Sequence, residues 1–85
     1  MATYSIQIKK SAQKEIKALP ESERQRVIAK IQSLASVPRG PDCKKLSAQE
    51  RYRVRVGAYR ILYEIHDDVL VIMIVKVAHR KDVYR

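Results

Sequence analysis

The chain has 85 residues, which suits one domain with a single two-layer core, so we expect residues 1–85 to form one domain. Eighteen basic against nine acidic side chains leave a net charge of +9, spread over both halves of the chain, which excludes a detachable basic tail and indicates a polyanionic partner. The single cysteine, Cys43, cannot form an internal disulfide and is typical of a cytoplasmic protein.

The first half of the chain predicts one strand and two helices. Thr3 to Lys9 alternates between apolar and polar residues, as expected of a half-buried strand. Ser11 then predicts the N-cap of a short helix, which Pro20 ends. Pro20 also suits the opening turn of a second helix, and the two helices are expected to form an antiparallel hairpin. The apolar stripe predicted for the second helix consists of Val27, Ile28, Ile31, Leu34 and Ala35.

The second half predicts a loop and then an antiparallel meander. Val37 to Gln49 contains two prolines and a glycine and has no period, so it is predicted to be a connecting loop. Three strands are expected at roughly Arg51 to Val56, Tyr59 to His66 and Val69 to Val77. The last of them is too short to span a bilayer and contains Lys76, so we expect a buried strand and no membrane association.

Two turns fix the expected register of this meander. A two-residue turn at Gly57-Ala58 would pair Arg55 with Arg60. A two-residue turn at Asp67-Asp68 would give the pairs Ile65 with Leu70, Tyr63 with Ile72, and Ile61 with Ile74.

The expected fold is α+β. A small, mostly antiparallel sheet, made of the N-terminal strand and the three-stranded meander, packs on the helical hairpin. The other face of the sheet has no helical layer and carries both basic and apolar side chains, which indicates a partner surface. The residues expected on this face are Arg53, Arg55, Arg60, Leu62, Val71, Met73 and Val75.

Opposed arginines are the most informative feature of the meander. Like charges directly opposite each other destabilise a strand pair, so Arg55 and Arg60 either splay into solvent or hold an anion. The second interpretation, together with Arg53, Arg80 and Tyr84, indicates a phosphodiester ligand. Because no glycine-rich phosphate loop and no zinc-like spacing of cysteine or histidine occurs, we expect neither a metal nor a cofactor.

Two segments carry a resemblance to a known family. R-Y-R-V-R-V-G-A-Y-R-I-L-Y-E-I and the ending V-A-H-R-K-D-V-Y-R, following a strand and a helical hairpin, resemble the RelE branch of the RelE/ParE toxin superfamily over essentially the whole chain. The resemblance implies a RelE-like fold and the toxin of a type II toxin-antitoxin system. It further implies a ribosome-dependent endoribonuclease that cuts messenger RNA in the A site and is silenced by a RelB-like antitoxin.

The resemblance also implies roles for single residues. Arg60 resembles the phosphate-binding arginine, Arg53 and Arg55 the basic pair beside the scissile phosphate, and Arg80 the tail residue that assists the leaving group. Attack by a ribose 2′-hydroxyl on the adjacent phosphate needs a base, an acid and positive charge on the phosphorane, but no metal.

The proton-transfer group stays open at this point. Other members of the family carry lysines where this chain has Arg53 and Arg55, and a guanidinium does not give up its proton. Tyr84, which resembles the terminal aromatic of the family, and His79 are both candidates. Outside the catalytic set, Lys44 and Lys45 at the end of the loop are predicted to follow an RNA backbone.

Two other classes of function remain as alternatives. A ParE-like inhibitor of DNA gyrase would share the scaffold but would need no basic catalytic cluster. A non-catalytic, basic RNA-binding module would need exposed aromatic residues among its cations, and most of the five tyrosines are expected to face the core. The arginines and Tyr84 favour the nuclease.

Overall fold

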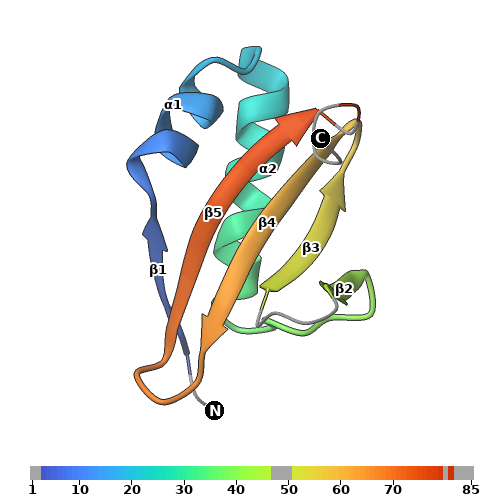
Figure 1. Ribbon diagram of the computed structural model, residues 1–85. Helices are drawn as coiled ribbons and strands as arrows, with labels where there is room; N and C mark the ends of the chain where they lie inside the picture. Colours follow the sequence, from blue (N-terminus) through green and yellow to red (C-terminus); the bar gives the residue numbers. More distant parts are fainter. Residues whose placement is uncertain (1–2, 47–50, 80, 82–85) are drawn as a thin grey trace.

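A computed structural model describes residues 3–46, 51–79 and 81 and shows two helices lying against one face of a five-stranded sheet (Figure 1). The elements are β1 (Ser5–Ile8), α1 (Lys10–Lys17), α2 (Glu21–Leu34), β2 (Cys43–Leu46), β3 (Arg51–Val56), β4 (Tyr59–His66) and β5 (Val71–His79). The strand order is β1-β5-β4-β3-β2, in which β1 runs parallel to β5 and every other neighbouring pair is antiparallel. The α+β prediction with a helical layer on one side is therefore confirmed.

The sheet contains one strand that the sequence did not predict. β2 lies within the segment predicted to be a loop and pairs with β3, so that Cys43 lies opposite Val54 and Lys44 opposite Arg53. Its four residues, C-K-K-L, show no alternation, and the strand exists because β3 offers it a pairing edge. The prediction of a loop throughout this segment was wrong.

The register of the meander was predicted correctly at one turn and wrongly at the other. Gly57, with φ of 58°, forms the β3–β4 turn, and Arg55 pairs with Arg60 as predicted. The β4–β5 turn instead uses the four residues 67–70, with Leu70 at φ of 54°, so β5 begins at Val71 and not at Val69. The observed pairs are Ile65 with Ile72, Tyr63 with Ile74, and Ile61 with Val77.

Neither helix has the side-chain N-cap that would satisfy its first backbone N–H groups. α1 starts at Lys10 with Lys9 at its N-cap, and no side chain caps it, so the prediction that Ser11 caps this helix was wrong. Pro20 occupies the N-cap of α2, whose first turn holds Glu21 and Glu23 at the positive end of the helix dipole. The helices are therefore held mainly by packing against the sheet.

The core lies between the helices and the sheet. Its fully buried members include Val27 of α2, Tyr63 of β4, and Ile72 and Ile74 of β5. Ile28, predicted to belong to the apolar stripe of α2, is 38% exposed because it lies on the flank of the helix and not on the side that faces the sheet. No helix among the described residues is long and apolar enough to cross a membrane.

Candidate nucleic-acid interface

The face of the sheet opposite the helices, called the open face below, carries two cross-strand rows of cations. In the first row Arg55 of β3 lies opposite Arg60 of β4, which lies opposite Ala78 of β5. The second row runs across four strands and consists of Lys44, Arg53, Leu62 and Lys76. Since residues paired in this way extend from the same face of a sheet, the register brings the predicted Arg53, Arg55 and Arg60 together.

Arg60 differs from its neighbours in being buried. Its exposed fraction is 6%, and it is the one buried charged or polar residue among the described parts of the chain. Burying a guanidinium removes hydration that must be replaced by other interactions, so a buried arginine is rare unless it is paired. Away from bulk water its attraction for an anion is stronger than that of a solvated arginine.

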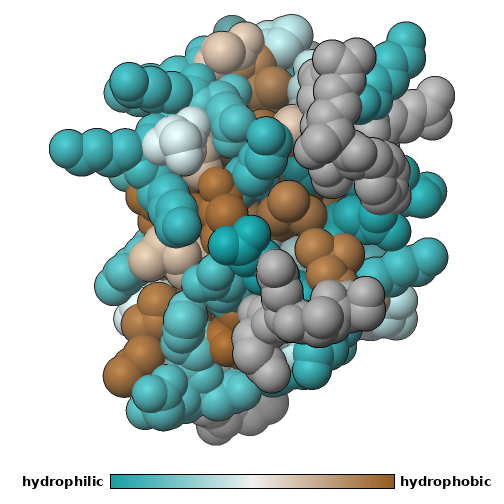
Figure 2. Space-filling model, viewed as in Figure 1, coloured by the Kyte–Doolittle hydropathy of each residue, from teal (hydrophilic) through white to brown (hydrophobic). Residues whose placement is uncertain are grey.

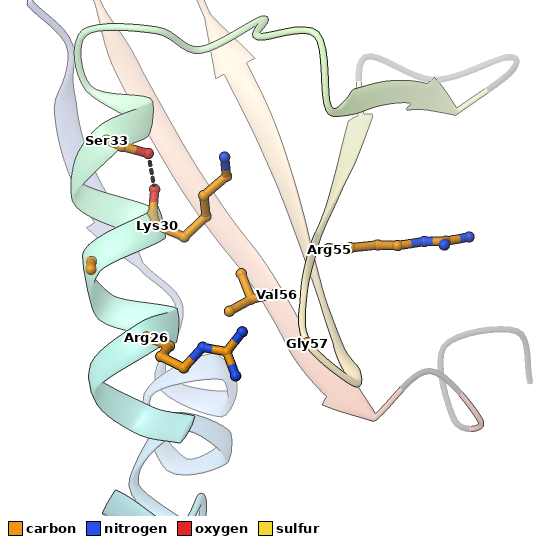
Figure 3. Close-up of a pocket in the computed structure, with 7 residues that line it drawn as sticks. Arg26, Lys30, Ser33, Arg55, Val56 and Gly57 are labelled. Atoms are coloured by element: carbon orange, nitrogen blue, oxygen red, sulfur yellow. Dashed lines mark hydrogen bonds between the residues drawn. The ribbon is translucent and has the colours of Figure 1, made fainter. Parts of the chain in front are cut away.

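Arg55 and Arg53 reach further into solvent. Arg55 is exposed and Arg53 is half-buried. Figure 3 shows Arg55 extending away from α2, while Val56, the next residue of β3, points toward that helix. The strand alternation thus separates the arginines from the core and turns them toward the open face.

Apolar side chains share the open face with the cations. Leu62, Met73 and Val75 lie on β4 and β5 and are each only partly buried. Figure 2 shows hydrophobic residues gathered over the middle of these strands, with hydrophilic residues around them. A mixed basic and apolar face of this kind was predicted from the sequence and is typical of a surface that binds a partner.

One acidic residue, Glu64, lies on the open face next to the row that contains Arg53. Glu64 lies opposite Arg51 on the open face, accepts a hydrogen bond from Arg51 Nε at 3.2 Å, and has His66 Nε2 at 3.0 Å from its other oxygen. Partial burial raises the pKa of Glu64, but the hydrogen bonds from His66 and Arg51 outweigh it and lower the pKa below its usual value. Glu64 therefore balances the charge of Arg51, and the excess positive charge lies in the two rows beyond it.

The structure separates Lys44 from Lys45. Adjacent residues of a strand face opposite sides, and Lys45 pairs with Tyr52, whose ring is buried in the core. Lys44, opposite Arg53, shares the open face with the arginines. Only one of these two predicted RNA-binding lysines therefore lies on the arginine surface.

Of the remaining predicted residues, the structure describes only His79, and it places this residue away from the arginines. His79 ends β5 opposite Tyr59, and their rings meet edge to face with centroids 5.6 Å apart. Tyr59 pairs with the buried Val56, so His79 lies on the helix side of the sheet. Arg80 and Tyr84 lie outside the described residues.

A second basic region lies between α2 and β3. It includes Arg55, and the two cations that α2 adds to it both have acidic partners. It is a hollow of about 500 Å³ toward which Arg26 and Lys30 extend from α2 (Figure 3). Arg26 lies 3.8 Å from a carboxylate oxygen of Glu23, and Lys30 forms an ion pair with Asp42. Since both cations have acidic partners, this hollow is a weaker candidate for a polyanion than the open face.

A polar network that was not predicted lies at the opposite end of the sheet, around Asp67. Arg39 donates two hydrogen bonds to Asp67, at 2.8 and 3.4 Å, and one to the hydroxyl of Tyr52 at 3.1 Å. Tyr4 donates to the same carboxylate at 2.5 Å. The hydrogen bonds from Arg39 and Tyr4 lower the pKa of Asp67. This network ties the α2–β2 connection to the β4–β5 turn, and so supports β2 with Lys44.

No group of three or more histidine, cysteine, aspartate or glutamate side chains within residues 3–46, 51–79 and 81 is arranged to hold a metal ion. The cations of the two rows are arginines and lysines, which are side chains that can bind phosphate through charge and hydrogen bonds. A small α+β domain with a cationic sheet face is the class of protein that this arrangement defines.

Comparison with known proteins identifies the family. Residues 6–84 match the family described as "ParE toxin of type II toxin-antitoxin system, parDE", and the chain belongs to this family. It is 31% identical to the "Putative toxin RelE1" of Methanocaldococcus jannaschii over 86 residues, covering 96% of both chains.

Solved structures of relatives share the fold. The archaeal RelE-RelB complex from Pyrococcus horikoshii OT3 contains a chain that matches with a TM-score of 0.84 and 29% identity, covering 95% of this chain and 99% of that one. The toxin-antitoxin complex RelBE2 from Mycobacterium tuberculosis contains a chain that matches with a TM-score of 0.83 and 26% identity, covering 93% of this chain and 100% of that one. The chain is thus a RelE-like toxin of the type II class.

Proposed function

We propose that this chain is a ribosome-dependent endoribonuclease that cuts messenger RNA in the A site, and that the open face is its active surface. The observation that carries the proposal is the buried Arg60 in a row with Arg55, next to a second row that contains Arg53. A guanidinium is planar and can donate to two oxygens of one phosphate, so the two rows together offer several such groups to an RNA backbone.

The proposed reaction is attack of a ribose 2′-hydroxyl on the adjacent phosphorus. The bond between O2′ and phosphorus forms while the bond from phosphorus to the 5′-oxygen breaks, which yields a 2′,3′-cyclic phosphate and a 5′-hydroxyl. Negative charge grows on the non-bridging oxygens in the transition state. Arg60, Arg53 and Arg55 would stabilise this charge, which is the largest effect that such a site can supply.

Proton transfer is assigned to the C-terminal tail. The base must remove the 2′-hydroxyl proton, and an acid must protonate the departing 5′-oxygen. His79 lies on the helix side of the sheet beside Tyr59, which weakens the case for it. We therefore favour Tyr84 for proton transfer or base stacking, and Arg80 for assistance to the leaving group.

We further propose that a RelB-like antitoxin silences the toxin. The relatives from Pyrococcus horikoshii OT3 and Mycobacterium tuberculosis are described as complexes of this kind. The apolar part of the open face, formed by Leu62, Met73 and Val75, offers a surface to an apolar segment of such a partner. An antitoxin bound there would also block access to the arginines.

Inhibition of DNA gyrase is the second candidate, because the matching family is named for the ParE toxin. An inhibitor that acts by binding a protein has no need of a buried arginine within a cationic sheet face. The arginine rows therefore favour the nuclease, and an experiment in cells separates the two activities.

Induction of the chain without an antitoxin should stop growth and produce cuts within translated messages. Arg60→Ala should abolish cutting, and Arg55→Ala, at an exposed position, should reduce it without a loss of folding. Arg26→Ala removes the same charge from the helical layer and serves as the matched control, with cutting as in the wild type. Intact messages together with accumulated DNA breaks would refute the nuclease and support the gyrase inhibitor.

A further inference from the structure

A break in the alternation of β5 changes the position of one lysine. Ile72 and Ile74 are fully buried on the helix side, so strict alternation would put Lys76 on that side as well, inside the core. The register shifts between Leu62 and Tyr63: Tyr63 pairs with Ile74, but Leu62 pairs with Lys76. Val75 is therefore an extra residue, and β5 contains a β-bulge at this point.

The bulge exchanges the faces of the residues that follow it. Val77 takes the core position and is 2% exposed, while Lys76 lies beside Leu62 on the open face. β-Bulges commonly redirect a side chain next to a functional site. The same irregularity keeps the β5 lysine out of the core and adds a cation to the arginine surface.

The surroundings of Lys76 are basic. It ends the row that contains Lys44 and Arg53, and it is the diagonal neighbour of Arg60, whose direct partner on β5 is the small Ala78. Diagonal positions on a sheet face lie within reach of a long side chain. Lys76 is half-buried and forms no ion pair or side-chain hydrogen bond with the described residues.

We propose that Lys76 is a further RNA-contacting residue, which binds a phosphate of the single-stranded backbone next to the one held by Arg60. The proposal rests on the proposed function, because it takes the open face as the RNA-binding surface. An ammonium group on a four-carbon stem suits a phosphate whose position varies with the sequence, whereas the guanidinium groups suit the fixed, reacting one. Lys76 would thus extend the cationic surface from β3 and β4 onto β5.

Binding of an RNA that cannot be cut tests this contact directly. The probe is a single-stranded oligonucleotide with 2′-O-methyl groups throughout, and its affinity is measured by fluorescence anisotropy between 50 and 200 mM salt, a range of roughly fourfold. Each phosphate contact to a single strand contributes about 0.7 to the slope of log affinity against log salt. Lys76→Gln should lower the magnitude of this slope by about 0.7. The ratio of wild-type affinity to variant affinity should therefore fall about 2.6-fold from the lowest to the highest salt concentration.

Two further variants control for charge and position. Lys76→Arg should keep the wild-type slope, because it keeps the cation. Lys14→Gln removes the same charge from α1 on the helical layer and should also leave the slope unchanged. A slope for Lys76→Gln equal to that of the wild type would overturn the proposal.

Cleavage on programmed ribosomes keeps this test separate from the proposed function. If the wild type cuts no message but Lys76→Gln lowers the binding slope, the nuclease proposal fails and the Lys76 contact stands. If the wild type cuts and Arg60→Ala does not, while Lys76→Gln binds and cuts as the wild type does, the nuclease stands and the Lys76 contact is wrong.

Discussion

Replacing Glu15 with alanine should destabilise the part of the sheet that carries Lys76. β1 ends at Ile8, opposite Ile74, so within the described part of the chain β5 has no strand partner on that side further along. The backbone N–H of Val77, just after the bulge, instead donates to Glu15 Oε1 of α1 at 2.9 Å in a partly buried position. The side chain of a helix therefore substitutes for the missing strand.

The expected magnitude follows from leaving this N–H without an acceptor. A buried backbone donor that loses its partner costs about 1–3 kcal/mol, and partial exposure to water places Glu15→Ala in the lower half of that range, at about 1–2 kcal/mol. For a domain of this size, such a loss lowers Tm by roughly 5–10 °C. Alanine has the higher helix propensity, so the loss cannot come from α1 itself.

Thermal unfolding followed by circular dichroism measures this effect, and Glu15→Gln is the matched control. The amide keeps an acceptor oxygen at the same distance along the side chain, so this variant should lose less than half as much stability as the alanine variant. Equal melting temperatures for the wild type and Glu15→Ala, or equal losses for both variants, would refute the reasoning.

Three other predictions concern separate parts of the molecule. The pKa of Asp67 is lower in the folded than in the unfolded state, so its carboxylate stabilises the fold at neutral pH, and this stability is lost as the pH falls below about 4. Urea unfolding between pH 7 and pH 3 should show the loss, and Asp67→Asn should make the free energy of unfolding depend less on pH. Gly57→Ala, at φ of 58°, should cost about 1–2 kcal/mol in the same unfolding assay, and Gly57→Asn less; no loss in either variant would contradict the turn assignment. Lys44→Gln should weaken RNA binding more than Lys45→Gln, since only Lys44 shares a face with Arg53, and equal effects in a filter-binding assay would argue against the open face.

Local signals in the sequence predicted the β3–β4 hairpin well. Gly57 can adopt the positive φ that a tight turn requires, and the flanking strands alternate regularly, so the pairing of Arg55 with Arg60 followed from turn chemistry alone. The grouping of the three arginines on one face followed from that register. This part of the candidate site was therefore predictable from nearby residues.

The features that were missed depend on contacts between distant parts of the chain. β2 has no periodicity of its own, and Arg39 meets Asp67 across 28 positions. The wider β4–β5 turn places the nonglycine residue Leu70 at a positive φ, which the sequence gives little reason to expect. The bulge in β5 also has no local signal, because V-I-M-I-V-K-V is compatible with a regular strand. Only the consequence that regular alternation would put Lys76 in the core argues against a regular strand.

The most direct test of the account is the chemistry of the cut ends. The purified chain is mixed with ribosomes programmed with a defined message, and the fragments are analysed for their terminal groups, with Arg60→Ala and Arg26→Ala in parallel. We expect an upstream fragment that ends in a 2′,3′-cyclic phosphate and a downstream fragment with a 5′-hydroxyl, formed by the wild type and Arg26→Ala but not by Arg60→Ala. An uncut message, a 5′-phosphate on the downstream fragment, or full cleavage by Arg60→Ala would contradict it.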